Sequence, residues 1–337
     1  MKEEIVQIEK IKPKLVNITK ESGIPLIGCI AFGIIDRGSN LLQIRCTSSC
    51  NMKCGFCSTS ANSFDIHPTN YIVDINYLFE ETKKIAELKG KGVIIFLDSV
   101  GEPMSHPNFI ELGGKLKTIE EVEEVVVITN GTFLSKEKIE KLKEYGLDRI
   151  NVSLHSIDPE RSKKLFGMTS YDVDKVKDAL VYAGKIGLNI MVTPVWVPNV
   201  NDKDIEEVIK FSKENGFGIG LQKYETYRYS RKMKKAKKQT YWKFYNKIKE
   251  WEKAYDIKLK VRAEDLNVEK RERIPEVIDI GEKVYADIVC NGWLTGQMIG
   301  KAKDRCISVN ECNKEIGDKV RVKIIENKNN IYLAECV

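Results

Sequence analysis

The sequence of 337 residues lacks the features that mark membrane-spanning and exported proteins. It contains no run of about 18 uncharged apolar residues, which a membrane-spanning helix requires. The apolar stretch IPLIGCIAFGII is too short. The first residues, MKEEIVQIEKIKPK, show no signal-peptide pattern and include acidic residues, which transit peptides avoid. These absences predict a cytoplasmic protein with no membrane contact.

Histidine is also scarce, with three residues against nine cysteines. Cytoplasmic cysteines are expected to be reduced, which favours metal binding or catalysis over disulfides. Cys50, Cys54 and Cys57 have the spacing C-x3-C-x2-C, whereas Cys46 lies within a predicted strand and is predicted to be a core thiol. A structural zinc site needs four ligands, usually from two paired knuckles, and the nearby His67 lies ten residues beyond Cys57. Three cysteines on one loop favour a [4Fe–4S] cluster with one iron open to a non-protein ligand.

An alternation of short β-branched runs and charged helical stretches begins at Leu41 and predicts parallel strands joined by helical crossovers. Six such units fit either an open barrel or a doubly wound sheet, and spacing alone does not decide between them. The predicted strands are Leu41–Cys46, Val93–Leu97, Val125–Thr129, Arg149–Leu154, Asn189–Thr193 and Phe217–Gln222. The predicted helices are Ile75–Leu88, Lys136–Tyr145, Asp174–Lys185 and Lys203–Asn215.

The pattern changes after Gln222. Between Arg228 and Arg262 there are fourteen Lys or Arg and three Asp or Glu, a local charge of +11, so that the rest of the chain sums to −5. Within this segment TYWKFYNKIKEWEKAY has the spacing of an amphipathic helix. Later residues form short alternating runs, which predict a small barrel of four or five antiparallel strands. We therefore predict a β-hairpin extension over 1–40, a main domain over 41–262 with a basic helical segment at 228–262, and a small β-barrel over 263–337.

The motif CNMKCGFC resembles the signature of the radical S-adenosylmethionine (radical SAM) superfamily, and the resemblance extends over roughly 41–222. It implies a partial (β/α)6 TIM-like barrel in which three cysteines hold the cluster and SAM chelates the open iron through its amino and carboxylate groups. Val100-Gly101-Glu102-Pro103 is similar to the Gly-Gly-Glu motif that binds the SAM amino group, with Val in place of the first Gly.

Polar residues that follow the next strands match the resemblance as well, because side chains at the carboxyl ends of barrel strands meet at one edge. Asn151, Ser153 and His155 end the fourth strand, where polar groups could bond the SAM ribose and carboxylate, although each also suits an ordinary cap or turn. The predicted cofactor-binding residues are Phe56, Gly101, Glu102, Thr129, Asn130, Asn151 and Ser153, and the predicted metal ligands are Cys50, Cys54 and Cys57. No general acid or base is assigned.

The resemblance implies reductive cleavage of SAM to a 5′-deoxyadenosyl radical, with an electron donor such as ferredoxin or flavodoxin. The C-terminal segment resembles the TRAM domain of RNA-modifying enzymes, and the whole chain is similar to an archaeal group of predicted iron–sulfur oxidoreductases. A second cluster on Cys290, Cys306 and Cys312 is the alternative to buried thiols there.

The basic segment suggests RNA independently, because its lysines are interleaved with Tyr229, Tyr241, Trp242 and Tyr245. We therefore predict modification of a tRNA or rRNA nucleotide by methylation, methylthiolation or another C–H functionalisation. A peptide or small metabolite is the alternative substrate, and a non-catalytic, metal-containing RNA-binding protein is the third hypothesis.

Overall fold

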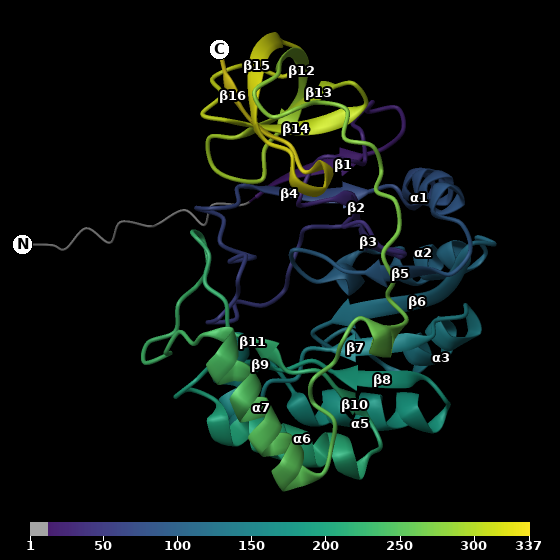
Figure 1. Cartoon of the computed structure of the whole chain (residues 1–337), viewed down its shortest axis with the longest axis vertical. Coiled ribbons are helices and arrows are strands. Elements are labelled where there is room, and N and C mark those ends of the chain that lie inside the picture. The colour runs from purple at the N-terminus through teal and green to yellow at the C-terminus, as the bar shows by residue number, and fades with distance from the viewer. Residues whose placement is uncertain (1–12) are drawn as a thin grey trace, which may run out of the picture.

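The computed structural model describes residues 13–337, which form a large partial barrel and a small closed barrel (Figure 1). Part of the predicted N-terminal extension, residues 1–12, lies outside the described residues. The main sheet has the order β10-β8-β7-β6-β5-β3-β2, in which β2 is antiparallel to β3 and the other neighbours are parallel. Because strand order follows chain order without reversal, the sheet curls into the partial (β/α)6 barrel and is not doubly wound. Its strands are β2 (Gly33–Asp36), β3 (Leu41–Arg45), β5 (Val93–Leu97), β6 (Val122–Thr129), β7 (Arg149–Val152), β8 (Asn189–Val192) and β10 (Gly218–Ile219).

Five helices cover the outer face of this sheet, and a sixth, α4, lies at the carboxyl ends of the strands. The four predicted helices are confirmed to within one residue at each end, and their starts are fixed by side chains such as Asp74 and Ser135, which accept hydrogen bonds from the first-turn N–H groups. Two further helices were not predicted, because they are short and one contains the pair Gly113-Gly114. The helices are α1 (Ile75–Lys89), α2 (Phe109–Lys117), α3 (Lys136–Glu144), α4 (Pro159–Phe166), α5 (Val173–Lys185) and α6 (Asp202–Glu214).

The predicted sixth strand is divided in two. After β10 the chain leaves the main sheet, and β11 (Gln222–Lys223) pairs with β9 (Val195–Trp196) in a separate parallel ribbon. This ribbon continues beyond the carboxyl ends of the main strands, and it carries side chains to the candidate site.

The prediction of a β-hairpin within residues 1–40 is wrong for the part that the structure describes, residues 13–40. β1 (Lys14–Ile18) pairs in parallel with β4 (Thr69–Val73), and β2 pairs with β3. The turn between β2 and β3 contains Gly38 at φ +82°, a conformation that glycine adopts without strain. That turn fixes β2 to the main sheet, and β1 is left to pair with residues that follow the cysteine loop.

The predicted small barrel is confirmed as a closed, five-stranded barrel with the order β12-β13-β14-β16-β15. Its strands are antiparallel as predicted, except that β14 and β16 are parallel. Gly28 contacts the barrel so closely that a Cβ there would lie 2.1 Å from the carbonyl oxygen of Cys306. The strands are β12 (Lys283–Asn291), β13 (Met298–Ala302), β14 (Arg305–Asn310), β15 (Lys319–Glu326) and β16 (Leu333–Cys336).

The predicted amphipathic helix is α7 (Tyr241–Tyr255), which lies at the opposite end of the molecule from the small barrel (Figure 1). Its buried residues Phe244, Ile248 and Trp251 face the main domain, and the rings of Trp251 and Trp196 meet edge to face at 4.9 Å. From α7 the chain returns along the amino-terminal ends of the strands, where the Asn40 N–H donates to the carbonyl of Glu269. Within residues 13–337, no helix is both long enough and apolar enough to cross a membrane.

Candidate functional site

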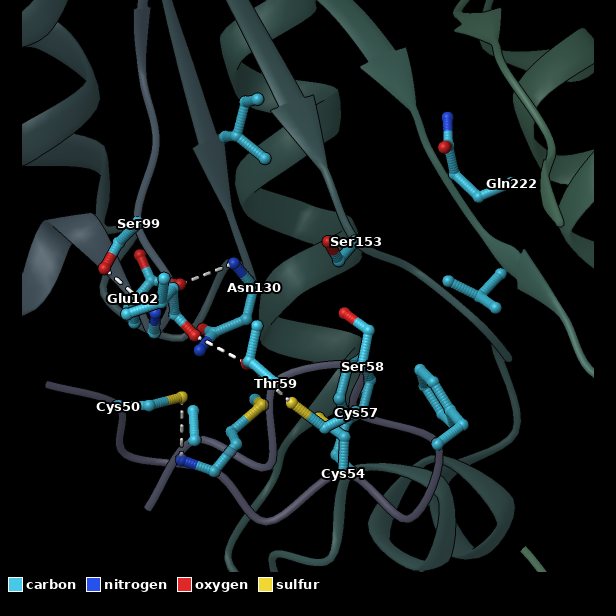
Figure 2. Close-up of a pocket in the computed structure, with 18 of the residues that line it drawn as sticks. Cys50, Cys54, Cys57, Ser58, Thr59, Ser99, Glu102, Asn130, Ser153 and Gln222 are labelled. Atoms are coloured by element: carbon cyan, nitrogen blue, oxygen red, sulfur yellow. Dashed lines mark hydrogen bonds between the residues drawn. The ribbon is translucent and has the colours of Figure 1, made fainter. Parts of the chain in front are cut away.

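Three cysteines line one side of a cavity of about 410 Å³ at the carboxyl ends of β5, β6 and β7 (Figure 2). Side chains from the strand ends, among them Glu102, Asn130 and Ser153, line the other side. Of the ten residues predicted as metal ligands or cofactor contacts, all but Asn151 line this cavity: Cys50, Cys54, Phe56, Cys57, Gly101, Glu102, Thr129, Asn130 and Ser153.

The cysteine loop has no regular secondary structure, and neighbouring elements hold it in place. The N–H groups of Lys53 and Gly55 donate to the carbonyls of Phe166 and Leu165 at the end of α4, both at 3.1 Å. At Gly167, φ is +61°, and a Cβ would lie 2.3 Å from the Lys53 carbonyl oxygen. Glycine at the end of α4 therefore lets this helix contact the loop backbone.

Arg231 fastens the other side of the loop. Its N–H donates to the carbonyl of Cys57 at 2.9 Å, and its guanidinium donates to the carbonyl of Cys54 at 3.3 Å and to the Ser63 hydroxyl at 2.7 Å. The same guanidinium also contacts the carbonyl of Ala61. Arg231 belongs to the basic segment predicted to bind RNA, but these hydrogen bonds join it to the cysteine loop.

The thiols of this loop lie in an environment that disfavours the free thiolate. Burial, the largest cause, raises the pKa of Cys50 to about 12 and raises the pKa of Cys54 well above its ordinary value. Nucleophilic cysteines need a lowered pKa, so these thiols are unsuited to that role. Bound metal supplies the positive charge that a thiolate requires here.

The arrangement fits a cluster better than a single metal ion. One zinc ion binds sulfur at about 2.3 Å, so its cysteine ligands must lie within about 4 Å of one another. Among the residues that the structure describes, no three Cys, His, Asp or Glu side chains are placed to hold one metal ion. Three thiols spread along one wall of a cavity suit a [4Fe–4S] cluster, in which each thiolate binds a different iron.

Glu102 begins the short 3-10 helix η1 (Pro103–Ser105) and is 1% exposed. Its Oε1 accepts from the Thr129 hydroxyl at 2.7 Å and from the Met104 N–H at 3.1 Å, and its Oε2 accepts from the Asn130 N–H at 2.7 Å. Burial raises its pKa to about 7, although these three donors each act to lower it. A carboxyl group that is half ionised near neutrality and lines a cavity is suited to receive a cationic group.

Asn130, which directly follows β6, connects that strand to the cysteine loop. Its side-chain amide donates to the Asn51 Oδ1 at 2.9 Å, and the Asn51 amide donates to the Thr132 hydroxyl at 2.9 Å. Sequence reasoning missed Asn51, whose role depends on contact with a strand about 80 residues away. Its position between Cys50 and Cys54 was the feature of the sequence that could have indicated this role.

His155 lines the cavity beside Phe56, and the two rings meet edge to face at 4.6 Å. The Val195 N–H donates to its Nδ1 at 2.9 Å, and burial lowers its pKa to about 3. The ring is therefore neutral, and its proton lies on Nε2.

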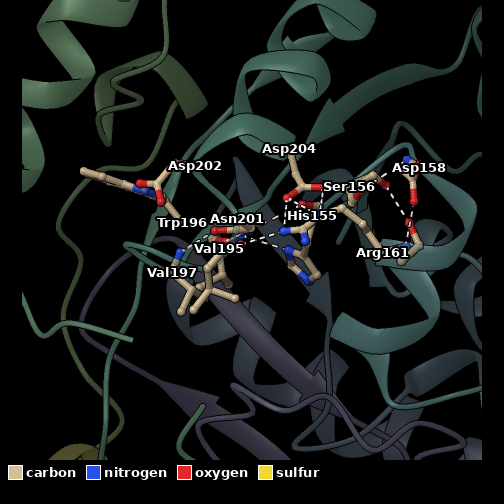
Figure 3. A network of polar contacts seen from close by, with 12 residues as sticks. His155, Ser156, Asp158, Arg161, Val195, Trp196, Val197, Asn201, Asp202 and Asp204 are labelled. Atoms are coloured by element: carbon tan, nitrogen blue, oxygen red, sulfur yellow. Dashed lines mark hydrogen bonds and ion pairs between the residues drawn. The ribbon is translucent and has the colours of Figure 1, made fainter. Parts of the chain in front are cut away.

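A polar network behind His155 fixes the chain around it (Figure 3). Asn201 accepts from the Val197 N–H at 2.7 Å and donates to the Val195 carbonyl at 2.9 Å. Asp204 accepts from the Ser156 hydroxyl at 2.7 Å, from the Arg161 Nε at 2.9 Å and from the Arg161 Nη2 at 2.6 Å. The sequence shows Asn201 and Asp204 only as ordinary residues at the start of α6, so their positioning role was missed.

The separate β9–β11 ribbon brings further side chains to the cavity that were not predicted: Gln222, Lys223, Glu225 and Tyr227. Lys223 pairs with Glu225 at 2.6 Å, and its Nζ lies 4.7 Å from the centre of the Tyr241 ring. Gln222 ends the sixth predicted strand and the other three residues follow it, so the reasoning applied to the earlier strand ends would have found them. The basic, aromatic segment thus begins at the wall of the cavity.

The other cysteines are buried, apart from Cys336 at the end of β16. Cys46 is 0% exposed, which confirms the prediction of a core thiol. Cys290 and Cys306 pack in the core shared with the main domain, whereas Cys312 packs in the core of the small barrel. The three residues considered for a second cluster are not brought to one cavity.

Comparisons with known proteins agree with this geometry. The sequence profile of the Radical SAM superfamily matches residues 44–212, half of the chain. An uncharacterized protein of Methanocaldococcus jannaschii is 34% identical over 93% of the chain and 79% of its own length. The GTP 3',8-cyclase of Aquifex aeolicus is 29% identical over 190 residues, which are 56% of this chain and 58% of that enzyme. The chain therefore spans little more than half the length of that cyclase.

Solved structures show the same fold at low sequence identity. Streptococcus suis SuiB is 17% identical, with a TM-score of 0.53 over 72% of this chain and 50% of that one. A radical SAM methyltransferase from Sphaerobacter thermophilus is 18% identical, with a TM-score of 0.50 over 66% of this chain and 65% of that one. At these sequence identities both comparisons support the fold alone.

We predict that Arg231→Gln loosens the cysteine loop. Loss of charged hydrogen bonds worth about 1.5–3 kcal/mol each should speed amide exchange over residues 54–63 by at least about tenfold. Hydrogen–deuterium exchange read by mass spectrometry measures this. Arg228→Gln is the control, because Arg228 is exposed and lies over the Tyr229 ring at 5.2 Å. Equal exchange in both variants would show that Arg231 does not hold the loop.

Proposed function

The chain is a member of the radical SAM superfamily, and from this premise we propose that it modifies a nucleotide of RNA. The cofactors of the superfamily are a [4Fe–4S] cluster and SAM. When bound, they supply the one-electron chemistry that activates an unreactive carbon–hydrogen bond. The residues of this chain have to hold these cofactors, exclude water and position the substrate.

The cavity provides groups for both cofactors. Cys50, Cys54 and Cys57 would hold the cluster through three thiolates, and no further cysteine lines the cavity. The Glu102 carboxylate would accept from the SAM ammonium, while Phe56 offers an aromatic face and Ser153 a hydroxyl.

The observation that carries the RNA proposal is the surface that adjoins this cavity, residues Tyr227–Lys243, called here the basic aromatic surface. Four aromatic side chains in it are exposed, namely Trp242 at 72%, Tyr227 at 63%, Tyr241 at 58% and Tyr229 at 37%. Tyr227 also lines the cavity. Exposed aromatic rings stack on unpaired bases, and neighbouring lysines bind phosphates. The exposed lysines of this surface are Lys232, Lys234, Lys235, Lys237, Lys238 and Lys243.

The small barrel lies on the other side of the cysteine loop and supports the same proposal. The Trp293 ring stacks on His67 at 4.0 Å, and the Thr295 N–H donates to the Ile66 carbonyl at 3.0 Å. The resemblance of this barrel to the TRAM domain suggests a second RNA contact. A ferredoxin or flavodoxin would supply the electron.

A second candidate substrate is a free purine nucleotide. The similarity to GTP 3',8-cyclases over 56% of the chain favours it, since those relatives act on GTP. Anaerobic turnover separates the candidates by substrate, with total tRNA in one reaction and GTP in the other. 5′-Deoxyadenosine alone indicates hydrogen abstraction, and its formation together with S-adenosylhomocysteine indicates methyl transfer.

We predict salt-dependent binding of tRNA through the basic aromatic surface. The affinity should fall steeply with salt, and replacement of Lys232, Lys234, Lys235 and Lys238 by Gln should lower the slope of log K against log salt by about 3. Trp242→Ala should cost about 1–3 kcal/mol of binding free energy through lost stacking. Filter binding at several salt concentrations measures both.

The matched control replaces four exposed lysines on α3 and α5, namely Lys136, Lys141, Lys143 and Lys175. This variant has the same change of net charge and should keep the slope of the unmodified protein. If the two quadruple variants behave alike, or the unmodified protein binds no tRNA, the RNA proposal fails.

We predict that each of Cys50→Ala, Cys54→Ala and Cys57→Ala lowers the iron content after anaerobic reconstitution from about four atoms per chain. The visible absorbance of the cluster should fall with it, because two thiolates do not retain a cubane cluster. Cys46→Ala is the control, since that thiol lies in the core, outside the cavity. A full iron content in any of the three variants would remove that cysteine from the ligand set.

We predict that SAM binding weakens as the pH falls below about 7. Glu102 has a pKa of about 7, so it is increasingly neutral below that pH and loses its attraction for the ammonium group. The limiting slope is about tenfold in affinity per pH unit. Glu102→Gln should bind SAM weakly at pH 8 and flatten the dependence, as equilibrium dialysis would reveal. A wild-type profile in the Gln variant would show that another group is responsible.

A further inference from the structure

The inner face of the main sheet continues below the cysteine cavity. Successive residues of a strand point to opposite faces, so Arg149, Asn151 and Ser153 share one face. Ser153 lines the cavity, whereas Ile150 and Val152 on the other face are fully buried under the helices. Asn151 therefore lies on the barrel's inner wall, about 7 Å below the row of residues at the cavity.

Two side-chain atoms on this inner wall, the Asn151 Oδ1 and the Arg149 Nε, have no hydrogen-bond partner. Asn151 is 5% exposed, and its Oδ1 is buried without a hydrogen bond. Arg149 is 8% exposed and pairs with Glu124 through Nη2 at 3.2 Å, but its buried Nε makes no hydrogen bond. Buried polar groups without partners are rare in folded proteins and each costs about 1–3 kcal/mol. Two on consecutive inward positions of one strand point to a ligand.

The surroundings of Asn151 suit a flat ring. In the sheet register Asn151 lies between Ile128 and Met191, both half-buried. Met191 in turn pairs with Gly218, at which a Cβ would lie 3.6 Å from the Met191 Cε. Apolar side chains on both flanks of an amide can sandwich or support an aromatic base while the amide reads its edge.

We propose that this inner wall is the base-recognition subsite of the enzyme, with Asn151 bonded to the edge of an unpaired nucleobase and the Arg149 Nε–H donating to an acceptor on it. The amide of Asn presents one donor and one acceptor side by side, the same pattern that a base edge presents. The proposal rests on the proposed RNA substrate and deepens it. It also replaces the cofactor role predicted for Asn151, which does not line the cysteine cavity.

A base reaches this wall only when it is unpaired or turned out of its helix. The exposed ring of Tyr227, which lines the cavity, would stack a neighbouring base, while the recognised base itself contacts the inner wall below the cavity. Recognition of the base and positioning of its reactive carbon then fall to one surface, the inner face of β6, β7 and β8.

The test measures base preference in the reconstituted holoenzyme with SAM bound. Dissociation constants are determined by equilibrium dialysis for AMP, GMP, CMP and UMP. The wild type should prefer one of the four by at least about tenfold, which is within the discrimination of one bidentate contact. Asn151→Ala should bind all four alike. Asn151→Asp, a second variant of nearly the same shape, should shift the preference toward bases that offer an amino group.

Two controls separate this role from structure and from cofactor binding. Asn70→Ala removes a half-buried amide from β4, outside the main sheet, and should leave the preference unchanged. SAM affinity and melting temperature should be the same in Asn151→Ala as in the wild type.

If Asn151→Ala keeps the base preference, the subsite is wrong, and a simultaneous loss of SAM affinity would return the residue to the cofactor. If the wild type binds tRNA with the expected salt dependence but shows no base preference, only this inference fails. If the wild type binds neither tRNA nor mononucleotides, both the proposed function and the base-recognition subsite are wrong.

Discussion

The site depends on one close backbone contact between two loops. Gly101 lies against the cysteine loop so tightly that a Cβ would come within 2.2 Å of the Ser49 carbonyl oxygen, to which the Glu102 N–H also donates at 2.7 Å. This contact fixes the backbone directly before Cys50 relative to the end of β5. Any side chain at position 101 would separate the thiols from the carboxylate, whatever cofactor either one binds.

The Glu102 side chain links the end of β5, which this contact positions, to the neighbouring strand β6. Two of its three hydrogen bonds come from the end of β6, at Thr129 and Asn130, and the third comes from Met104 in η1. Asn130 is joined in turn to Asn51 in the cysteine loop. The strand ends and the loop therefore form one closed polar circuit in a buried setting. Such circuits are rigid when every member is satisfied, and a single loss leaves a buried group without a partner. The same reasoning distinguishes Asn151, which lies outside the circuit and whose Oδ1 has no hydrogen-bond partner.

Local signals in the sequence predicted the parts of the fold that depend on local chemistry. Capping residues such as Asp74 and Ser135 mark the helix starts, and alternation of strand and helix marks the barrel, so those elements were found. The pairing of β1 with β4 and the split between β10 and β11 depend on contacts between distant residues, which no local pattern encodes. In the site, the spacing of the cysteines was sufficient to nominate them. Asn51, Asn201 and Asp204 take their roles only from neighbours that folding brings together.

The aromatic residues of the basic segment show how the structure divides one sequence pattern into two functions. Tyr245 is half-buried, and Lys260 lies 4.4 Å from the centre of its ring, while the ring of Tyr241 stacks on it at 6.0 Å. Its faces are thus occupied, and it serves to support Tyr241. Trp242 is 72% exposed and projects away from the buried face of the same helix. Helical spacing places neighbouring residues about 100° apart, so the aromatic residues of α7 are divided between its buried side and its exposed side. By the same measure Lys223 and Tyr245 lie against the Tyr241 ring, so the rings of this surface most open to an incoming base are Trp242 and Tyr227. Tyr227 is the one that joins this surface to the cavity.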